Sequence, residues 1–194
     1  MSRRRTRRRT AAAFAGRFAT IVLVGLLAAS TAPSVHADSI QAKPRRAAGS
    51  LSAYEHDLLR AVNSTRAEWG RGPVAVSVGL TAAAELHTTQ MVRRGFFEHE
   101  APGEAAFWHR IERFYPSRGF SYWAVGENLA YGAPTLEPDQ AVHEWLASPP
   151  HRRSLLSKTW RQVGIAAVHV ESAPGEYEDS PATVVTLDFG VRRR

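Results

Sequence analysis

The sequence has no cysteine among its 194 residues. This absence excludes disulfide bonds, thiol nucleophiles, thiolate metal sites and iron–sulfur clusters. Any metal site must therefore be built from histidine and carboxylate side chains. The fold must rely on its apolar core, and a chain of about 150 residues buries about 68–70% of the surface that it exposes when unfolded.

The sequence also lacks an apolar run long enough to cross a bilayer, which takes about 20 residues. Its longest run, residues 19–30, is about a dozen residues long and follows a segment, residues 1–17, with seven arginines and no acid. The branched Val35 and the small Ala37 then occupy the positions that a signal peptidase reads. This order is typical of a secretory signal. We predict a signal peptide over residues 1–37, no transmembrane segment after its removal, and a location at the cell envelope or outside the cell.

Without this leader, the chain has no excess of positive or negative charge. The whole chain carries 25 bases and 18 acids, and removing the seven arginines of the leader leaves 18 of each. The balance argues against nucleic-acid binding, so we predict no nucleic-acid partner. Two basic clusters remain, at residues 43–46 and 192–194. We interpret both as solvated tails rather than as contacts to an anionic envelope surface.

The first two thirds of the remaining chain have a helical pattern. Residues 38–51 are polar and predict a flexible linker. Apolar residues at helical spacing then predict helices over residues 52–69, 80–94, 104–114 and 138–147. Ser52 and Glu55 form the S-x-x-E pattern of a capping box at the start of the first helix. The pair Pro149-Pro150 is predicted to end the last helix.

The last third changes to a strand pattern. Residues 163–170 and 182–189 are rich in branched apolar side chains, and an acidic loop with two prolines joins them. Residues 74–78 are a further candidate strand. Helices first and a terminal hairpin last predict an α+β fold, with helices packed on an antiparallel sheet.

Three short segments each hold one side chain that can bind a metal or carry a proton. They span residues 96–102, 126–132 and 145–152, and the side chains are those of His99, Glu127 and His151. The glycines at 126 and 132 predict tight backbone turns near Glu127. Residues 120–123 form an aromatic run that we predict in a loop, where it would line an apolar groove. His87 has the spacing of a core residue on a helix face.

In this order, the segments resemble the bacterial branch of the CAP superfamily, which includes cysteine-rich secretory proteins, antigen 5 and pathogenesis-related 1 proteins. The resemblance covers residues 52–191 and includes the motif Gly126-Glu127-Asn128. It implies a three-layer α-β-α sandwich, with helices around a small, mainly antiparallel sheet. It also implies a central cleft lined by two histidines and two glutamates, of which His99, Glu127 and His151 match three.

The second glutamate of that cleft is missing here. Ser148 stands at its position, three residues after Trp145. We therefore predict a cleft of His99, Glu127 and His151, with Ser148 as a polar fourth member. Glu144 directly precedes Trp145, and a step of one residue along a helix turns the side chain by about 100°. This predicts that Glu144 faces away from the cleft.

Three functions stay open at this point. The first is a secreted protein that binds a lipid, a sterol-like ligand or a protein partner. Its His99 and His151 would bind a divalent metal such as zinc weakly, with Glu127 either as a third ligand or as a hydrogen-bond partner that orients one imidazole. The second is a metal-dependent, protease-like hydrolase with Glu127 as the base. No H-E-x-x-H or G-x-S-x-G motif supports it. The third is a structural envelope protein, in which the three residues form a buried polar network without a ligand.

Overall fold

The structure is a computed structural model and describes residues 50–194. The predicted signal peptide and most of the predicted linker lie outside the described residues. The elements follow in the order α1 (Ala53–Glu68), β1 (Ala75–Val76), α2 (Val78–Arg94), α3 (Phe107–Phe114), β2 (Tyr122–Gly132), α4 (Pro138–Ala147), α5 (Pro149–Leu155), β3 (Gln162–Ala173), the short 3₁₀ helix η1 (Gly175–Tyr177) and β4 (Ser180–Arg193). Within this part of the chain, no helix combines the length and the apolar character needed to cross a membrane.

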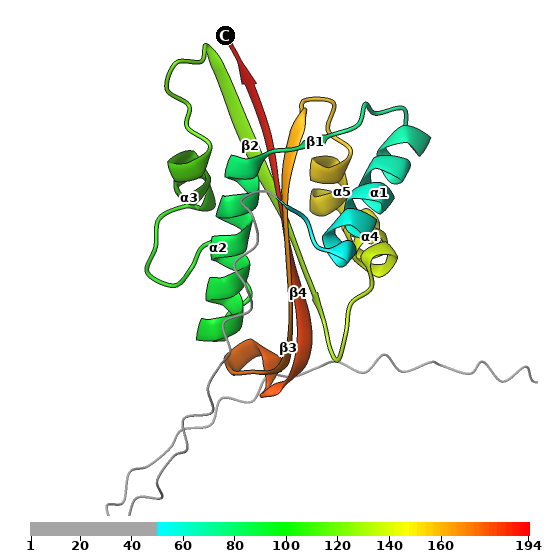
Figure 1. Cartoon of the computed structure of the whole chain (residues 1–194), viewed down its shortest axis with the longest axis vertical. Helices are drawn as coiled ribbons and strands as arrows, with labels where there is room; N and C mark the ends of the chain where they lie inside the picture. Colours follow the sequence, from blue (N-terminus) through cyan, green and yellow to red (C-terminus); the bar gives the residue numbers. More distant parts are fainter. Residues whose placement is uncertain (1–49) are drawn as a thin grey trace, which may run out of the picture. The chain divides into compact units, whose positions relative to one another are not determined.

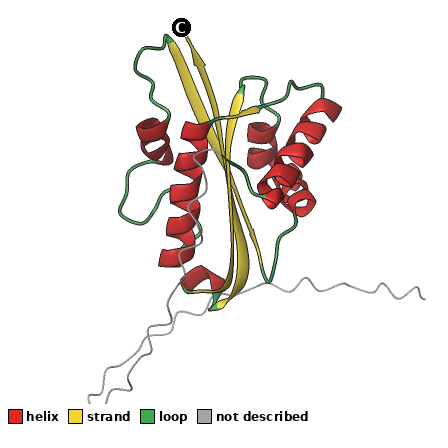
Figure 2. Ribbon diagram, in the orientation of Figure 1, coloured by secondary structure: helices red, strands yellow, loops and turns green. Residues whose placement is uncertain are grey.

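The strands form one sheet with the order β1-β3-β4-β2. β1 pairs with β3 in parallel, whereas β3 and β2 both pair with β4 in antiparallel fashion. Helices α2 and α3 lie on one face of the sheet, and α1, α4 and α5 lie on the other (Figure 1, Figure 2). This arrangement confirms the predicted α+β fold with helices on both sides of a mainly antiparallel sheet.

Strand β4 lies inside the sheet and is buried on both faces along most of its length. Because successive side chains of a strand point to opposite faces, Leu187 and Phe189 pack into the apolar cluster beneath α1, α4 and α5. Thr186 points the other way and accepts a hydrogen bond from Thr88 of α2 at 2.8 Å. Asp188 shares this second face, so the alternation places one acid in the buried layer under α2 and α3.

Local sequence signals explain how two of the helices are placed. The capping box of α1 is confirmed, because the side chains of Ser52 and Glu55 each accept a hydrogen bond from the other residue's backbone N–H. Glu55 also accepts from the backbone of Ala167 at 3.1 Å, which ties α1 to β3. On the other face, a Cβ at Gly164 would lie 2.0 Å from the carbonyl carbon of Leu80. Glycine at this position lets α2 lie directly on β3.

Strand β2 was not expected. Tyr122 and Trp123, predicted in a loop, begin a strand that pairs with β4 over its whole length. Gly126 and Gly132, predicted in turns, lie within it as well. At Gly126 a Cβ would come within 2.8 Å of the Trp160 ring, so the glycine provides room for a side chain rather than a turn. Tertiary pairing thus outweighs the weak strand propensity of this glycine-containing segment.

Several boundaries differ by a few residues from the expectation, and three of these differences concern the surroundings of the site and the end of the chain. The short helix α3 begins at Phe107 rather than at residue 104. The prolines Pro149 and Pro150 follow the end of α4, as predicted, but they also form the first turn of α5. Proline suits that position because the first N–H groups of a helix have no partner within it. Arg192 and Arg193, predicted in a tail, belong to β4.

Candidate functional site

The site lies along β2, an edge strand of the sheet. Glu127 is part of this strand, whereas His99 lies in the connection between α2 and α3, and His151 lies in α5. The two histidines thus come from the two opposite helical layers. Their ring centroids are 6.3 Å apart. Asn128, next to Glu127, points to the other face and donates from its side chain to the carbonyl of His151 at 3.0 Å, which holds α5 against the strand.

Both carboxylate oxygens of Glu127 are engaged. Oε1 lies 2.7 Å from Nδ1 of His99. Oε2 pairs with the guanidinium of Arg110, which projects from α3. The side chain of Glu127 is 0% exposed and that of Arg110 is 7% exposed. Arg110 also donates to the carbonyl of His99 at 3.2 Å, so a single guanidinium holds both partners in place.

A second buried acid lies beside Glu127. Asp188 is its direct partner in the β2–β4 register and is 0% exposed. A guanidinium nitrogen of Arg110 lies 4.0 Å from its Oδ1. Burial raises the pKa of Asp188 well above its usual range, and the charge of Glu127 raises it further. Burial also raises the pKa of Glu127, to about 7, although Arg110 opposes the shift. Two adjacent buried carboxyl groups beside a single cation are most stable when one of them is protonated. We place this proton on Asp188.

The two cleft imidazoles are neutral near pH 7. Burial lowers the pKa of His99, and Glu100 partly opposes this shift. Burial also lowers the pKa of His151, with His99 as the second cause. A neutral His99 that faces a carboxylate with Nδ1 carries its proton there, which leaves the lone pair of Nε2 free. Glu127 therefore sets both the tautomer and the orientation of this ring.

A pocket of about 300 Å³ opens beside His151. Its walls are mostly apolar or aromatic, and its polar groups lie towards α4 and α5. The lining residues are Phe97, Leu129, Ala130, Tyr131, Glu144, Trp145, Ser148 and His151. The Phe97 and Tyr131 rings meet edge to face with centroids 4.7 Å apart. Ser148 and His151, both predicted in the cleft, lie together in this pocket.

The expectation for Glu144 was wrong, because its side chain lines the pocket. Glu144 and Ser148 are four residues apart, and side chains at this spacing lie on the same side of a helix. Ser148 directly follows the last residue of α4 and continues that side. The expectation considered only the turn of about 100° between Glu144 and the adjacent Trp145, whereas the four-residue spacing to Ser148 decides which side of the helix Glu144 shares.

Sequence reasoning missed Arg110 and Asp188. A signal existed for Asp188, because it is a lone acid within a run of apolar and branched residues that predicts a buried strand. Arg110 had no such signal, since it is one of two arginines in a short helix with exposed charged side chains. His87 was interpreted correctly as a core residue. It is 0% exposed, contacts the carbonyl of Glu98 at 2.9 Å, and burial lowers its pKa to about 3.

The donor set does not fit a catalytic metal centre. Among residues 50–194, no group of three or more histidine and carboxylate side chains is arranged to hold a metal ion. Catalytic zinc normally has three protein ligands, and here Glu127 is already bound to His99 and Arg110. Weak metal binding by His99 and His151 alone stays a prediction.

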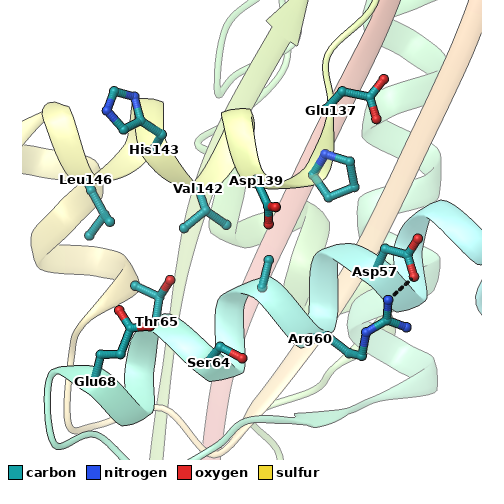
Figure 3. A pocket seen from close by; sticks show the side chains of 12 residues that line it. Asp57, Arg60, Ser64, Thr65, Glu68, Glu137, Asp139, Val142, His143 and Leu146 are labelled. Carbon is teal, nitrogen blue, oxygen red and sulfur yellow. Dashed lines mark ion pairs between the residues drawn. The ribbon is translucent and has the colours of Figure 1, made fainter.

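A larger hollow of about 790 Å³ lies elsewhere, between α1 and α4 (Figure 3). Charged side chains surround it, including Asp57 and Arg60, which form an exposed ion pair at 2.7 Å. Among the described residues, its charged lining side chains are all exposed, and Thr65 is its one buried polar lining residue. We therefore assign it no role in the site.

Comparison with known proteins relates this chain to a family. The profile of the Cysteine-rich secretory protein family (CAP) matches residues 59–189. The uncharacterized protein YkwD of Bacillus subtilis is 29% identical over 122 residues, which cover 63% of this chain and 45% of that relative. This chain thus spans less than half the length of that protein.

Two solved structures share the fold. An outer surface protein from Borrelia burgdorferi is 20% identical, with a TM-score of 0.57 over 75% of this chain and 99% of that one. An extracellular protein containing a SCP domain from Bacillus anthracis is 22% identical, with a TM-score of 0.52 over 75% of this chain and 45% of that one. Since the family profile covers more than half of its residues, the chain belongs to the Cysteine-rich secretory protein (CAP) family.

Proposed function

We propose that this protein acts by binding a small amphipathic ligand, such as a lipid or a sterol-like molecule, in the cleft beside β2. The observation that carries the proposal is the apolar pocket next to two neutral imidazoles. We further propose that binding takes place outside the cell or at its envelope. The predicted signal peptide supports this location, and so do the descriptions of two proteins with the same fold as an outer surface protein and an extracellular protein.

The lining of the pocket indicates which chemistry it accepts. Phe97, Leu129 and Trp145 offer an apolar surface, while Ser148 and His151 offer hydrogen-bonding groups at one side. Ligand sites are typically apolar with a few polar groups that fix orientation, and their volumes start at about 300 Å³. The pocket has about this volume. It therefore suits a ligand with an apolar body and a hydroxyl or carbonyl head, of which it encloses a part.

The state of Glu127 favours binding over hydrolysis. A general base must lie within hydrogen-bond reach of the proton that it removes and must have a free lone pair. Both oxygens of Glu127 are engaged by His99 and Arg110, and its side chain is 0% exposed. In our proposal Glu127 orients His99 and does not activate water. If a divalent metal binds as well, His99 and His151 would hold it, and Glu127 would act through His99.

A pocket-filling substitution tests the proposal with two fluorescent probes, dehydroergosterol for sterols and cis-parinaric acid for fatty acids. We expect at least one probe to bind and Ser148→Phe to weaken its binding about tenfold or more, because the new ring occupies the pocket; a loss of about 1.4 kcal/mol gives this factor. The matched control is Ser64→Phe, in the separate hollow between α1 and α4. If neither probe binds, or if both variants bind like the wild type, the cleft is not a site for these ligands.

A further inference from the structure

One end of the sheet collects positive charge in chain segments that themselves contain no acid, although Glu112 of α3 accepts a hydrogen bond from Ser117 there. Four chain segments meet there: residues 69–74 before β1, 115–121 before β2, 156–161 before β3, and 190–194 at the end of β4. The register confirms that they meet, because Ala75 pairs with Gln162, Gln162 with Gly190, and Tyr122 with Arg193. This end is uppermost in Figure 1, where the C-terminus is marked. Together the segments carry seven cations and no aspartate or glutamate: Arg71, Arg118, Lys158, Arg161, Arg192, Arg193 and Arg194.

Four of these cations, Arg71, Arg161, Arg192 and Arg193, contact carbonyls or aromatic rings instead of acids. The guanidinium of Arg192 lies 3.8 Å from the centroid of the Tyr115 ring and 4.6 Å from that of Phe120. The guanidinium of Arg193 lies 4.9 Å from the centroid of Tyr122. Arg161 donates to three carbonyls of its own loop, at 2.8, 3.3 and 2.8 Å. Within residues 50–194, none of the seven cations takes part in an ion pair between side chains. The charge of this end is therefore not neutralised by ion pairs, and four of its cations are also held in position.

Large apolar side chains are exposed around the same end. Of the five that the described residues expose, four lie at or beside it: Trp69, Val78, Phe114 and Tyr122, with exposed fractions from 37% to 55%. Trp69 caps the end of α1, Val78 begins α2, and Phe114 ends α3. Amphipathic aromatic rings are enriched at the level of lipid headgroups, where lysine and arginine also lie favourably.

The opposite end of the sheet has the reverse charge. The two connections that leave the strands there, residues 133–137 and 174–179, carry four acids and no base. Arg93 and Arg94 at the end of α2 lie towards this end, and Arg94 pairs with Glu104 at 3.1 Å. Because residues 38–194 have equal numbers of acids and bases, a negative surface would orient the domain rather than simply attract it.

We propose that the basic end of the sheet docks the domain on an anionic lipid bilayer, with the arginines at the phosphate groups and Trp69 and Tyr122 at the headgroup level. Each lysine or arginine near an anionic membrane contributes about fivefold to affinity, since about 1 kcal/mol corresponds to that factor. The surface is separate from the cleft, so this proposal does not rest on the proposed ligand. Soluble polyanions share the phosphate chemistry but would not need the exposed rings.

Vesicle sedimentation tests this surface directly. We would use residues 50–194, because all three apolar clusters, the whole sheet and the capping box of α1 lie within them, and the arginine-rich leader would itself bind such vesicles. We expect binding to vesicles of phosphatidylglycerol and phosphatidylcholine, no binding to phosphatidylcholine alone, and a loss of binding with rising salt. Arg118→Gln with Arg193→Gln should weaken binding about 25-fold.

The matched control removes two exposed arginines elsewhere, Arg60→Gln with Arg93→Gln. It should bind within about twofold of the wild type, whereas Tyr122→Ser should weaken vesicle binding several-fold by removing an interfacial ring. The Ser148→Phe variant should bind vesicles like the wild type, which keeps this test independent of the cleft. An equal loss in both arginine pairs would overturn the proposal, as would wild-type binding to heparin but not to anionic vesicles, or a Tyr122→Ser variant that binds vesicles unchanged.

Discussion

Replacing Arg110 with glutamine removes the arginine that pairs with the buried Glu127. The pair is almost inaccessible to water, with Glu127 0% and Arg110 7% exposed. Breaking a buried ion pair by removing one partner costs about 3–5 kcal/mol, because the remaining charge is left without compensation. We expect Arg110→Gln to lower the free energy of unfolding by this amount at pH 8.5. His99 would also lose the donor to its carbonyl, at 3.2 Å in the wild type.

The destabilisation caused by Arg110→Gln should be larger at high pH than at low pH. Burial raises the pKa of Glu127 from 4.5 to about 7 in the folded protein. A carboxyl with a raised pKa contributes most stability below its unfolded value, here about 4.5, and this contribution is lost as the pH rises through its folded value. Without Arg110 the folded pKa rises further. At pH 5 the Glu127 carboxyl is largely protonated in both the wild type and Arg110→Gln. The loss of unfolding free energy in the variant should therefore shrink to about 1–2 kcal/mol, the range for a lost hydrogen bond.

Urea denaturation at pH 5 and pH 8.5 measures both values, with the slope of the transition checked for change. Arg113→Gln is the matched control, because Arg113 lies three residues further along α3 and is exposed. Its effect should stay within about 0.5 kcal/mol at both pH values. Our assignment of the buried network is wrong if Arg110→Gln costs the same at both pH values, or if it costs no more than the control.

Two further predictions concern the cleft and the core. Burial lowers the pKa values of His99 and His151, so zinc binding should persist at pH 6, below the usual histidine pKa. The double variant His99→Ala/His151→Ala should abolish zinc binding. Calorimetry that finds equal zinc binding in the variant and the wild type would exclude these two histidines as ligands. Gly164→Ala should destabilise the fold by about 1–3 kcal/mol, because its Cβ would overlap the backbone of Leu80. Gly72→Ala, with nothing within 4 Å, is the control in thermal unfolding, and equal melting temperatures would refute this packing.

The buried network and the pocket have separate roles in this cleft. Glu127, Arg110 and Asp188 are inaccessible, with Arg110 bonded to Glu127 and 4.0 Å from Asp188, whereas Ser148 and His151 line open space. His99 connects the two groups, since Nδ1 faces Glu127 and the ring lies 6.3 Å from His151. Variants of the network should therefore act mainly on stability and on the orientation of His99, and variants of the pocket should act mainly on ligand affinity.

The sequence by itself determined those features that depend on neighbours along the chain. The capping box at Ser52 and the branched residues of β3 rest on local periodicity and local hydrogen bonds, so they could be predicted. The family resemblance also identified His99, Glu127 and His151. Glu144 could have been placed in the cleft from helical spacing alone.

Only the tertiary structure decided the features that depend on distant partners. β2 becomes a strand because β4 pairs with it along its whole length, although its glycines and aromatic start predicted a loop. Arg110 and Asp188 join Glu127 from a helix and a neighbouring strand, and no local pattern links these three positions. The basic end of the sheet arises in the same way, because four segments far apart in the sequence meet where the strands begin or end. The balanced net charge of residues 38–194 did not predict this basic end, because a sum over the chain contains no information about where its charges lie in space.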